Sequence, residues 1–165
     1  MSGTRSRVAS EFTISLPRTM QVAGTLQPTA AASADPVRNS TPFKVLVADD
    51  NQDAADTLSL LLEIAGYEAV VAHSGEEAFE RLLRHSPDAA ILDIGMPDMS
   101  GYEVARRFRK ESGRNVFLLA VTGWGQQDDI ARAKAAGFDE HLTKPVDPDR
   151  VEQLLREHLG SQIRA

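Results

Sequence analysis

The sequence ILDIGMPDMSG, residues 91–101, runs from apolar residues into a single carboxylate, Asp93, and then into a loop that contains proline and glycine. An apolar run that ends at turn residues is typical of a buried strand. Asp93 would then lie at the carboxyl edge of a sheet, where open α/β sheets bind their ligands. A lone Asp in such a place is more often a helix cap or a loop residue, but the sequence on both sides argues against that alternative.

Short apolar runs and helical patterns alternate along the chain on both sides of this stretch. The apolar runs predict five strands, over Phe43–Ala48, Tyr67–Ala72, Asp88–Asp93, Val116–Val121 and Phe138–Leu142. The helical patterns predict five helices, over Asp53–Ala65, Ser74–Arg84, Ser100–Glu111, Gln126–Ala136 and Asp147–Leu159. This alternation predicts an α/β fold, with five parallel strands and five helices that cover both faces of the sheet.

The spacing of apolar residues also predicts which side of each helix faces the core. The inward positions are Leu58, Leu61, Leu62, Ala65, Ala78, Leu82, Leu83, Val104, Phe108, Val151, Leu154, Leu155 and Leu159. Gly66 and Gly137 directly follow two of the predicted helices, where glycine commonly ends a helix.

Composition narrows the class of protein. The chain has 165 residues, a net charge of −6 and no cysteine, which excludes disulfides, thiol catalysis and thiolate metal sites. The negative charge argues against a nucleic-acid partner. We expect no membrane association and a cytoplasmic location, because no apolar run reaches the length of a membrane span and no apolar segment follows the N-terminal arginines.

Residues 1–42 differ from the rest of the chain. They are rich in Ser, Thr, Ala and Pro and show little hydrophobic periodicity, so we predict a mostly disordered extension before a domain at residues 43–160. With four arginines against two acidic residues this extension carries +2, which leaves −8 on the remainder. Residues 11–16 alternate weakly, and a short strand or docking segment is the alternative to a plain tail.

Polar residues follow four of the five predicted strands. Asp49 and Asp50 follow the first, Asp93 ends the third, Thr122 ends the fourth and Lys144 follows the fifth. Because parallel strands place these ends at one edge, three carboxylates, a hydroxyl and an ammonium should converge there. Carboxylates in such a cluster repel one another, and oxygen ligands suit Mg²⁺. The alternatives are that Asp49 and Asp50 only cap the first helix and that Lys144 is a simple ion-pair partner.

The motifs that carry these residues resemble the receiver domain of bacterial response regulators. They are ADD at 48–50, LDIGMPDMSG at 92–101, VTG at 121–123 and TKP at 143–145, in the order typical of that family. The resemblance covers about Phe43 to Leu159. It implies a flavodoxin-like sheet with strand order 2-1-3-4-5. Residues 122–126 and 144–147 are most similar to receivers that are attached to, or work with, hybrid sensor kinases.

The resemblance also implies a role for each site residue. Asp93 would be the phosphoacceptor, and Asp49, Asp50, Asp93 and the backbone carbonyl of Gly95 would hold Mg²⁺. Thr122 would be the switch hydroxyl and Lys144 the partner of the phosphoryl group. The phosphodonor would be a sensor histidine kinase or a histidine phosphotransfer protein. The downstream target would bind the face formed by the fourth helix, the fifth strand and the fifth helix.

Three positions depart from the commonest family pattern. His141 stands where many receivers carry an aromatic switch residue. A neutral, half-buried imidazole is one interpretation, and a pH-sensitive switch is the other, because imidazole titrates near about pH 6.5. Gly95 and Trp124 would flank the phosphoryl group, Gly95 leaving space and Trp124 shielding it. Trp124 as an exposed contact residue is the alternative.

Competing functions remain at this stage. No patterned segment follows Leu159, so we expect a stand-alone receiver that is not an enzyme in the usual sense, beyond its own phosphorylation and slow dephosphorylation. A magnesium-dependent aspartyl-phosphate phosphatase would need an acid/base two residues after the nucleophile, where this chain has Gly95. Asp98 lies past a proline and is poorly placed for that role. An unphosphorylated docking module is the third alternative.

Overall fold

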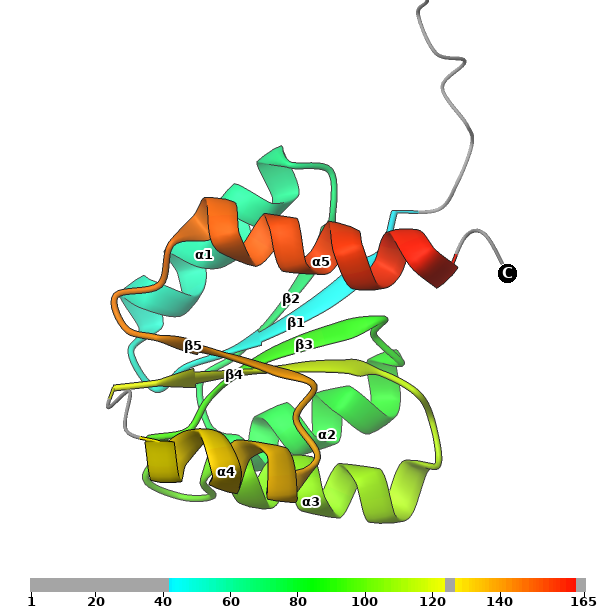
Figure 1. The fold of residues 1–165 in the computed structure, drawn as a ribbon. Coiled ribbons are helices and arrows are strands. Elements are labelled where there is room, and N and C mark those ends of the chain that lie inside the picture. Colours follow the sequence, from blue (N-terminus) through cyan, green and yellow to red (C-terminus); the bar gives the residue numbers. More distant parts are fainter. Residues whose placement is uncertain (1–41, 124–126, 163–165) are drawn as a thin grey trace, which may run out of the picture. The chain divides into compact units, whose positions relative to one another are not determined.

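A computed structural model describes residues 42–123 and 127–162, and all statements below refer to these residues. Five parallel strands form one sheet in the order β2-β1-β3-β4-β5, as predicted (Figure 1). The strands are β1 Lys44–Ala48, β2 Glu68–Ala72, β3 Ala89–Asp93, β4 Phe117–Thr122 and β5 Glu140–Thr143. The helices are α1 Gln52–Ile64, α2 Gly75–His85, α3 Gly101–Ser112, α4 Gln127–Ala136 and α5 Pro148–Gln162.

The helices form one layer on each face of the sheet. Figure 1 shows α1 and α5 on one face and α2, α3 and α4 on the other. β1, β3 and β4 lie in the middle of the sheet and are almost entirely buried, as expected for strands that are covered on both faces. Their side chains divide into two clusters, one against α1 and α5 around Val47 and Ile91, the other against α2, α3 and α4 around Leu46 and Leu92.

The fifth strand begins later than the sequence predicted. Phe138 continues the end of α4 instead of pairing in the sheet: Gly137 adopts a positive φ of 98° and the Phe138 amide donates to Ala133 O at 3.1 Å. The Phe138 ring is buried in the core. Pairing therefore starts at Glu140 and extends to Thr143, which lies beside Thr122.

Three helix positions predicted to face the core are exposed. Leu61 and Leu83 are each 39% accessible, and Ala65 caps α1 at the surface. α1 instead buries Ala55, Ser59 and Leu62, and α2 buries Ala78, Phe79 and Leu82. The period of each helix was predicted correctly, but the buried face is rotated, because it depends on where the sheet lies.

Two glycines allow the loop after β3 to pack against the starts of α2 and α3. A Cβ atom at Gly75 would lie 2.0 Å from the backbone oxygen of Met99, and one at Gly101 would lie 2.4 Å from the backbone oxygen of Asp93. Backbone atoms cannot move aside as a flexible side chain can. Both positions therefore require glycine, and the loop that carries Asp93 is held closely against its neighbours.

Candidate functional site

The carboxyl ends of the three central strands bring the predicted residues together. β1 pairs with β3 up to Ala48 and Leu92, so Asp49 and Asp93 follow on neighbouring strands. Asp93 lies in register with Val121 on β4, one residue before Thr122. Thr122 is buried at 4% accessibility, and its carbonyl accepts a 2.7 Å hydrogen bond from the amide of Lys144. Residues from four separate segments thus share one edge of the sheet.

Three carboxylates form a compact acidic cluster at this edge. One oxygen from each of Asp49, Asp50 and Asp93 lies within 4.8 Å of the other two. Asp49 and Asp93 are buried, whereas Asp50 is exposed. Oxygen donors at such separations, with one open side, fit a hard cation that keeps part of its water shell. Receiver domains typically bind Mg²⁺ through an acidic pocket of this kind, so the residues present fit that ion.

Lys144 supplies the positive charge in the cluster. Its Nζ lies 2.9 Å from Asp49 Oδ2 and 3.0 Å from Asp93 Oδ2, so it bridges the two buried carboxylates. Burial of the ammonium group lowers the pKa of Lys144, but the hydrogen bonds and charges of Asp49 and Asp93 outweigh burial and hold the pKa above its usual value. The lysine is therefore charged at neutral pH. The alternative interpretation of Lys144 as a simple ion-pair partner is correct in that it forms ion pairs. Its partners, however, are the two buried carboxylates of the site, Asp49 and Asp93.

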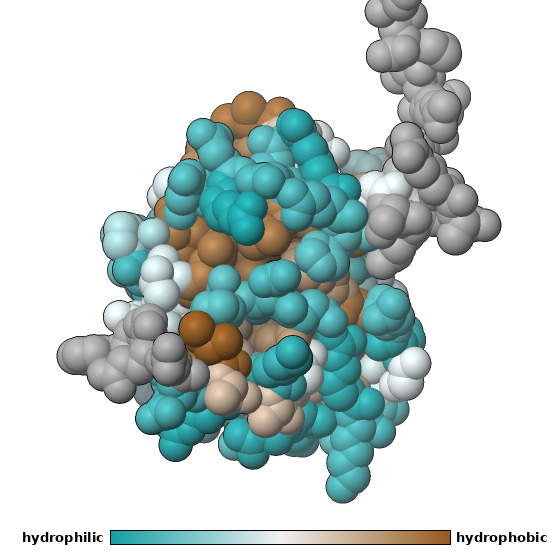
Figure 2. Space-filling view, in the orientation of Figure 1, coloured by the Kyte–Doolittle hydropathy of each residue, from teal (hydrophilic) through white to brown (hydrophobic). Residues whose placement is uncertain are grey.

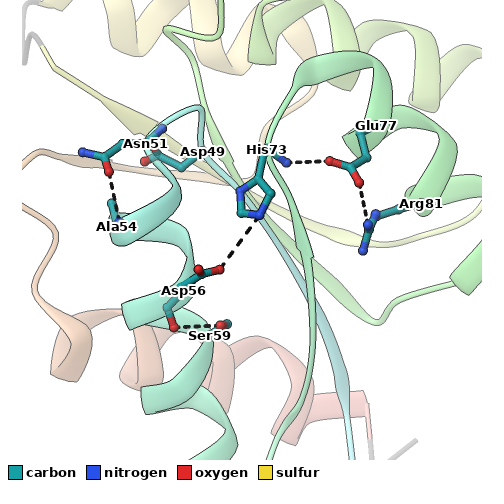
Figure 3. A network of polar contacts seen from close by, with 8 residues as sticks. All are labelled: Asp49, Asn51, Ala54, Asp56, Ser59, His73, Glu77 and Arg81. Carbon is teal, nitrogen blue, oxygen red and sulfur yellow. Dashed lines mark hydrogen bonds and ion pairs between the residues drawn. The ribbon is translucent and has the colours of Figure 1, made fainter.

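Asn51, and not Asp49 or Asp50, caps the first helix. Its side-chain oxygen accepts a 3.2 Å hydrogen bond from the Ala54 amide (Figure 3). Asp49 holds this turn in place by accepting a 2.9 Å hydrogen bond from the amide of Asn51. The interpretation of Asp49 and Asp50 as helix caps is therefore wrong, and the side chain of Asp50 is left at the open side of the acidic cluster.

Gly95 lies directly opposite the Asp93 carboxylate. Its amide donates to Asp93 Oδ1 at 3.1 Å, and an added Cβ would lie 3.6 Å from Asp93 Oδ2. Any side chain at position 95 would stand beside the carboxylate, which agrees with the predicted flanking position. The role of the Gly95 carbonyl as a metal ligand stays a prediction.

Asp98 anchors the loop that follows Asp93, a role that the sequence analysis missed. Its Oδ1 accepts from the Gly75 amide at 2.9 Å and its Oδ2 from the Glu76 amide at 2.8 Å. Partial desolvation of the carboxylate raises the pKa of Asp98, but these amides and those of Met99 and Asp98 outweigh it and lower the pKa to about 2. A carboxylate committed to the start of α2 is not available as an acid/base for Asp93. An acidic residue 23 positions from a helix start gives no signal in the sequence.

A second polar network follows β2 beside the acidic edge, by which we mean the edge of the sheet that carries Asp49, Asp50 and Asp93 (Figure 3). The amide of His73 donates to Glu77 Oε2 at 2.7 Å, and this bond, with the ion pair to Arg81, outweighs burial and lowers the pKa of Glu77. The imidazole Nε2 of His73 lies 4.0 Å from Asp56 Oδ1. His73 does not join the acidic cluster, and the network ties β2 to the first turn of α2 and to α1.

The two remaining predicted residues lie away from the cluster or outside the described residues. His141 is half-buried on β5 in register with Ala120 and lines a shallow cavity with Ile130 and Phe138. This agrees with the interpretation of a half-buried imidazole and leaves the switch role as a prediction. Trp124 lies outside the described residues, as do residues 1–41, so the predicted extension and domain boundary also stay predictions.

Known proteins resemble this chain over most of the described region. The virulence sensor protein BvgS of Bordetella pertussis is 37% identical over 136 residues, which are 79% of this chain but only 11% of BvgS. The chain thus spans about a tenth of that relative. The polar-differentiation response regulator DivK of Brucella ovis is 30% identical over 117 residues, which are 70% of this chain and 95% of DivK.

Solved structures of similar sequence share the fold. A CheY-like receiver domain protein from Methanospirillum hungatei has a TM-score of 0.69 at 26% identity, covering 75% of this chain and 98% of that one. The chemotaxis protein CheY4 of Vibrio cholerae has a TM-score of 0.68 at 29% identity, covering 72% and 99%. Within the described residues, no helix is both long and apolar enough to cross a bilayer. Residues 45–156 match the response regulator receiver domain family, and with the strand order and the acidic edge this shows that the chain belongs to that family.

Proposed function

We propose that this receiver takes a phosphoryl group onto Asp93 with the help of Mg²⁺ and thereby switches its binding to a partner. The observation that carries the proposal is the bridge of Lys144 Nζ between Asp93 Oδ2 and Asp49 Oδ2, beside three clustered carboxylates. The site therefore combines a nucleophilic carboxylate, a fixed cation and a set of oxygen ligands at one edge of the sheet. Phosphoryl transfer needs this kind of positioning and charge neutralisation more than covalent chemistry from the protein.

In the proposed reaction, an Asp93 oxygen attacks the phosphorus of a phosphohistidine. The P–N bond breaks, an acyl phosphate forms on Asp93, and the leaving imidazole takes up a proton. Mg²⁺, when bound by Asp49, Asp50 and Asp93 with the Gly95 carbonyl, supplies positive charge to the transferring oxygens. Lys144 already lies at hydrogen-bond distance from Asp93 and supplies charge from the other side.

The phosphoryl group would change the contacts of Lys144 and Thr122. It adds about two negative charges and three acceptor oxygens. Lys144 would exchange its bond to the Asp93 carboxylate for one to the phosphoryl group, and the Thr122 hydroxyl would donate to the same group. Since the Lys144 amide is bound to the Thr122 carbonyl, both residues would move together.

The phosphodonor would be a sensor histidine kinase or a histidine phosphotransfer protein, docking beside α1. A cavity of about 430 Å³ opens next to Asp93 and Lys144 and continues along Leu58 and Leu61 of α1. Three exposed apolar residues extend it on the helix surface: Leu60, Leu61 and Ile64, the last 75% accessible. Exposed apolar residues grouped on one helix are typical of a protein contact. Its continuity with the acidic edge favours the phosphodonor as the occupant.

The downstream target would bind the face made by α4, β5 and α5. Figure 2 shows this face, with hydrophobic residues visible among hydrophilic ones along the sheet edge between α5 and α4. Ile130 on α4 is 39% accessible and lines a cavity of about 250 Å³ with His141 of β5. β5 of this surface pairs with β4 up to Thr122, which supports its use as the output. We propose a cytoplasmic location for the whole pathway.

A phosphatase with the same chemistry is the competing function. Receiver domains are generally non-catalytic signalling modules, and two features of this site favour that class here. Gly95 stands where a phosphatase of this type needs its acid/base, and Asp98 is bound to the amides of Gly75 and Glu76. We therefore propose only self-phosphorylation and slow self-dephosphorylation. An unphosphorylated docking module would not explain the complete set of charged residues.

The deciding experiment is labelling by a small-molecule phosphodonor with and without Mg²⁺. We expect stoichiometric, Mg²⁺-dependent labelling of the native chain, none in Asp93→Asn, and native labelling in Asp128→Asn, an exposed carboxylate on α4. Equal labelling of native protein and Asp93→Asn would end the phosphoacceptor assignment. Repeated turnover of a generic phosphate ester would favour the phosphatase.

The role of Lys144 is tested separately. We expect Lys144→Ala to bind Mg²⁺ and to accept the phosphoryl group more slowly, but to lose the phosphorylation-dependent change in partner binding. Normal signalling by this variant would show that Lys144 does not read the phosphoryl group.

A further inference from the structure

A groove between α3 and α4 lies apart from the acidic edge and has no part in the proposed phosphorylation. Its volume is about 460 Å³, and Tyr102, Arg106, Arg132, Ala135 and Ala136 line it. None of these residues lines the cavity beside Asp93. Figure 1 shows α4 next to α3 on the same face of the sheet. Sites for small molecules commonly have volumes of about 300–1,000 Å³, so the groove is large enough for one.

The two arginines of this groove differ from every other arginine in the described part of the chain. Neither Arg106 nor Arg132 forms an ion pair or hydrogen bond there. Each of the others has a polar or aromatic partner; these are Arg81, Arg84, Arg107, Arg109, Arg114, Arg150 and Arg156. In a chain with a net charge of −6, a guanidinium with neither an ion pair nor a hydrogen bond is unexpected. That both such residues line one groove points to an anion as their partner.

The walls of the groove keep the space open and hold its aromatic side chain in place. Ala135 and Ala136 are too small to fill it. Tyr102 is fixed in place, because its hydroxyl donates to Asp129 O at 3.4 Å and its ring meets Phe138 edge-on at 6.4 Å. Burial and Asp129 raise the pKa of Tyr102, whereas the charge of Arg132, which lines the same groove, opposes them.

We propose that this groove binds the phosphate group of a small phosphate monoester, with Arg106 donating from α3 and Arg132 from α4. A guanidinium fork matches the oxygens of both phosphates and carboxylates. A phosphate monoester carries about two charges and is neutralised by two guanidinium groups, whereas a carboxylate needs only one. Glu103, Asp128 and Asp129 lie one turn before the two arginines and repel any anion, so binding depends on direct contact with both guanidinium groups. The three oxygens of a phosphate can accept from both guanidinium forks at once, which makes the phosphate the better match.

Such a ligand would connect the two helices that line the groove. Bound between Arg106 and Arg132, it would hold α4 against α3, and α4 starts at Gln127, shortly after Thr122. Binding to the folded state alone would also raise the unfolding temperature. The inference does not depend on phosphorylation of Asp93.

The test is calorimetric titration of the full chain with adenosine monophosphate, inorganic phosphate and adenosine at constant ionic strength. A chelator removes divalent ions, and an Asp93→Asn background excludes binding at the acidic edge. We expect saturable one-to-one binding of adenosine monophosphate. Arg106→Gln and Arg132→Gln should each weaken it about tenfold or more, since each removes charge-assisted hydrogen bonds. Arg106→Lys, which keeps the charge but not the fork, should bind with intermediate affinity.

Arg84→Gln is the matched control, because Arg84 is an exposed arginine on α2 that pairs with Glu80. It should leave the affinity unchanged, and all four arginine variants should keep the native unfolding midpoint because these side chains are exposed. Equal affinity for phosphate and adenosine monophosphate would identify the phosphate alone as the ligand group. Tighter binding of the nucleotide, with none of adenosine, would show that the organic part adds contacts.

Three results would overturn the inference. They are absence of saturable binding by either phosphate compound, binding that both glutamine variants leave unchanged, and tighter binding of a glutamate-rich peptide than of adenosine monophosphate. The last result would identify the groove as a contact for an acidic protein segment.

Discussion

α3 and α4 lie side by side on one face of the sheet, yet they are held to it very differently. α3 buries Val104 and Phe108 completely, together with Ala105. Among the described side chains of α4, only those of Ala133 and Ala136 are buried. Full burial of a Val or Phe side chain contributes about 1.5–3 kcal/mol, whereas a methyl group contributes about 0.8 kcal/mol or less. α4 is therefore held to the sheet by much less apolar burial than α3.

The described residues that precede the two helices show the same contrast. The loop before α3 directly follows Asp93 and is fixed by Asp98 and by the close contacts at Gly75 and Gly101. Before α4, a Cβ at Gly123 would meet nothing within 4 Å. Elements with few buried apolar contacts open at lower free energy. The difference teaches that the loop between Asp93 and α3 is firmly held. α4 is the better candidate for movement.

The largest expected effect tests the anchoring of α3. Phe108→Ala should lower the free energy of unfolding by about 3–5 kcal/mol, because it leaves a cavity under the helix. The matched change on the other helix, Ala136→Gly, should cost only about 1 kcal/mol, mainly through helix propensity. Urea denaturation measures both. Similar losses would show that the two helices are held equally.

The next effect tests the loop that carries Asp93. Gly101→Ala should lower the free energy of unfolding by about 1–3 kcal/mol or more, because its Cβ would lie 2.4 Å from the Asp93 carbonyl oxygen. It should also slow labelling of Asp93, since the carboxylate would shift with its backbone. The control is Gly160→Ala in α5, where nothing lies within 4 Å of an added Cβ and a small gain is expected.

A smaller effect concerns the charge of Asp98. Asp98→Asn should cost about 1 kcal/mol at neutral pH, as loss of a helix cap does. Because the pKa of Asp98 is lowered from 3.8 to about 2, its charged form stabilises the fold above about pH 4, and this contribution is lost as the pH falls through about 2. Denaturation curves of the two proteins should therefore converge as the pH falls from 4 to 2. A difference that is independent of pH would contradict the assignment.

The smallest effect on stability is expected at Ile130 on the outer face of α4. Ile130→Ser should change the free energy of unfolding by less than about 0.5 kcal/mol, because the side chain is 39% accessible and far from fully packed. Labelling of Asp93 should be unaffected, while binding of a downstream partner should weaken. A large loss of stability would show that α4 is part of the core after all.

Sequence patterns predicted the fold of the family and the residues at the acidic edge. They did not predict the hydrogen bonds that hold the neighbouring turns and loops in place. The order of apolar runs and helices was enough for five strands and five helices, and the strand ends placed Asp49, Asp93 and Lys144 together. The cap at Asn51 and the anchor at Asp98 were missed. A cap is set by the backbone angles of one turn, and the Asp98 contacts join segments 22 and 23 residues apart.

The sequence by itself determined which residues are chemically equipped for the site, because apolar runs end in carboxylates at positions that a parallel sheet must bring to one edge. Only the tertiary structure decided which face of α1 and α2 is buried, so that Leu61 and Leu83 are exposed. It alone placed Arg106 and Arg132, neither of which forms an ion pair with the described residues, along one groove. The physical reason is that periodicity fixes which side chains share one side of a helix, whereas the contacts of that side depend on which other segment packs against the helix.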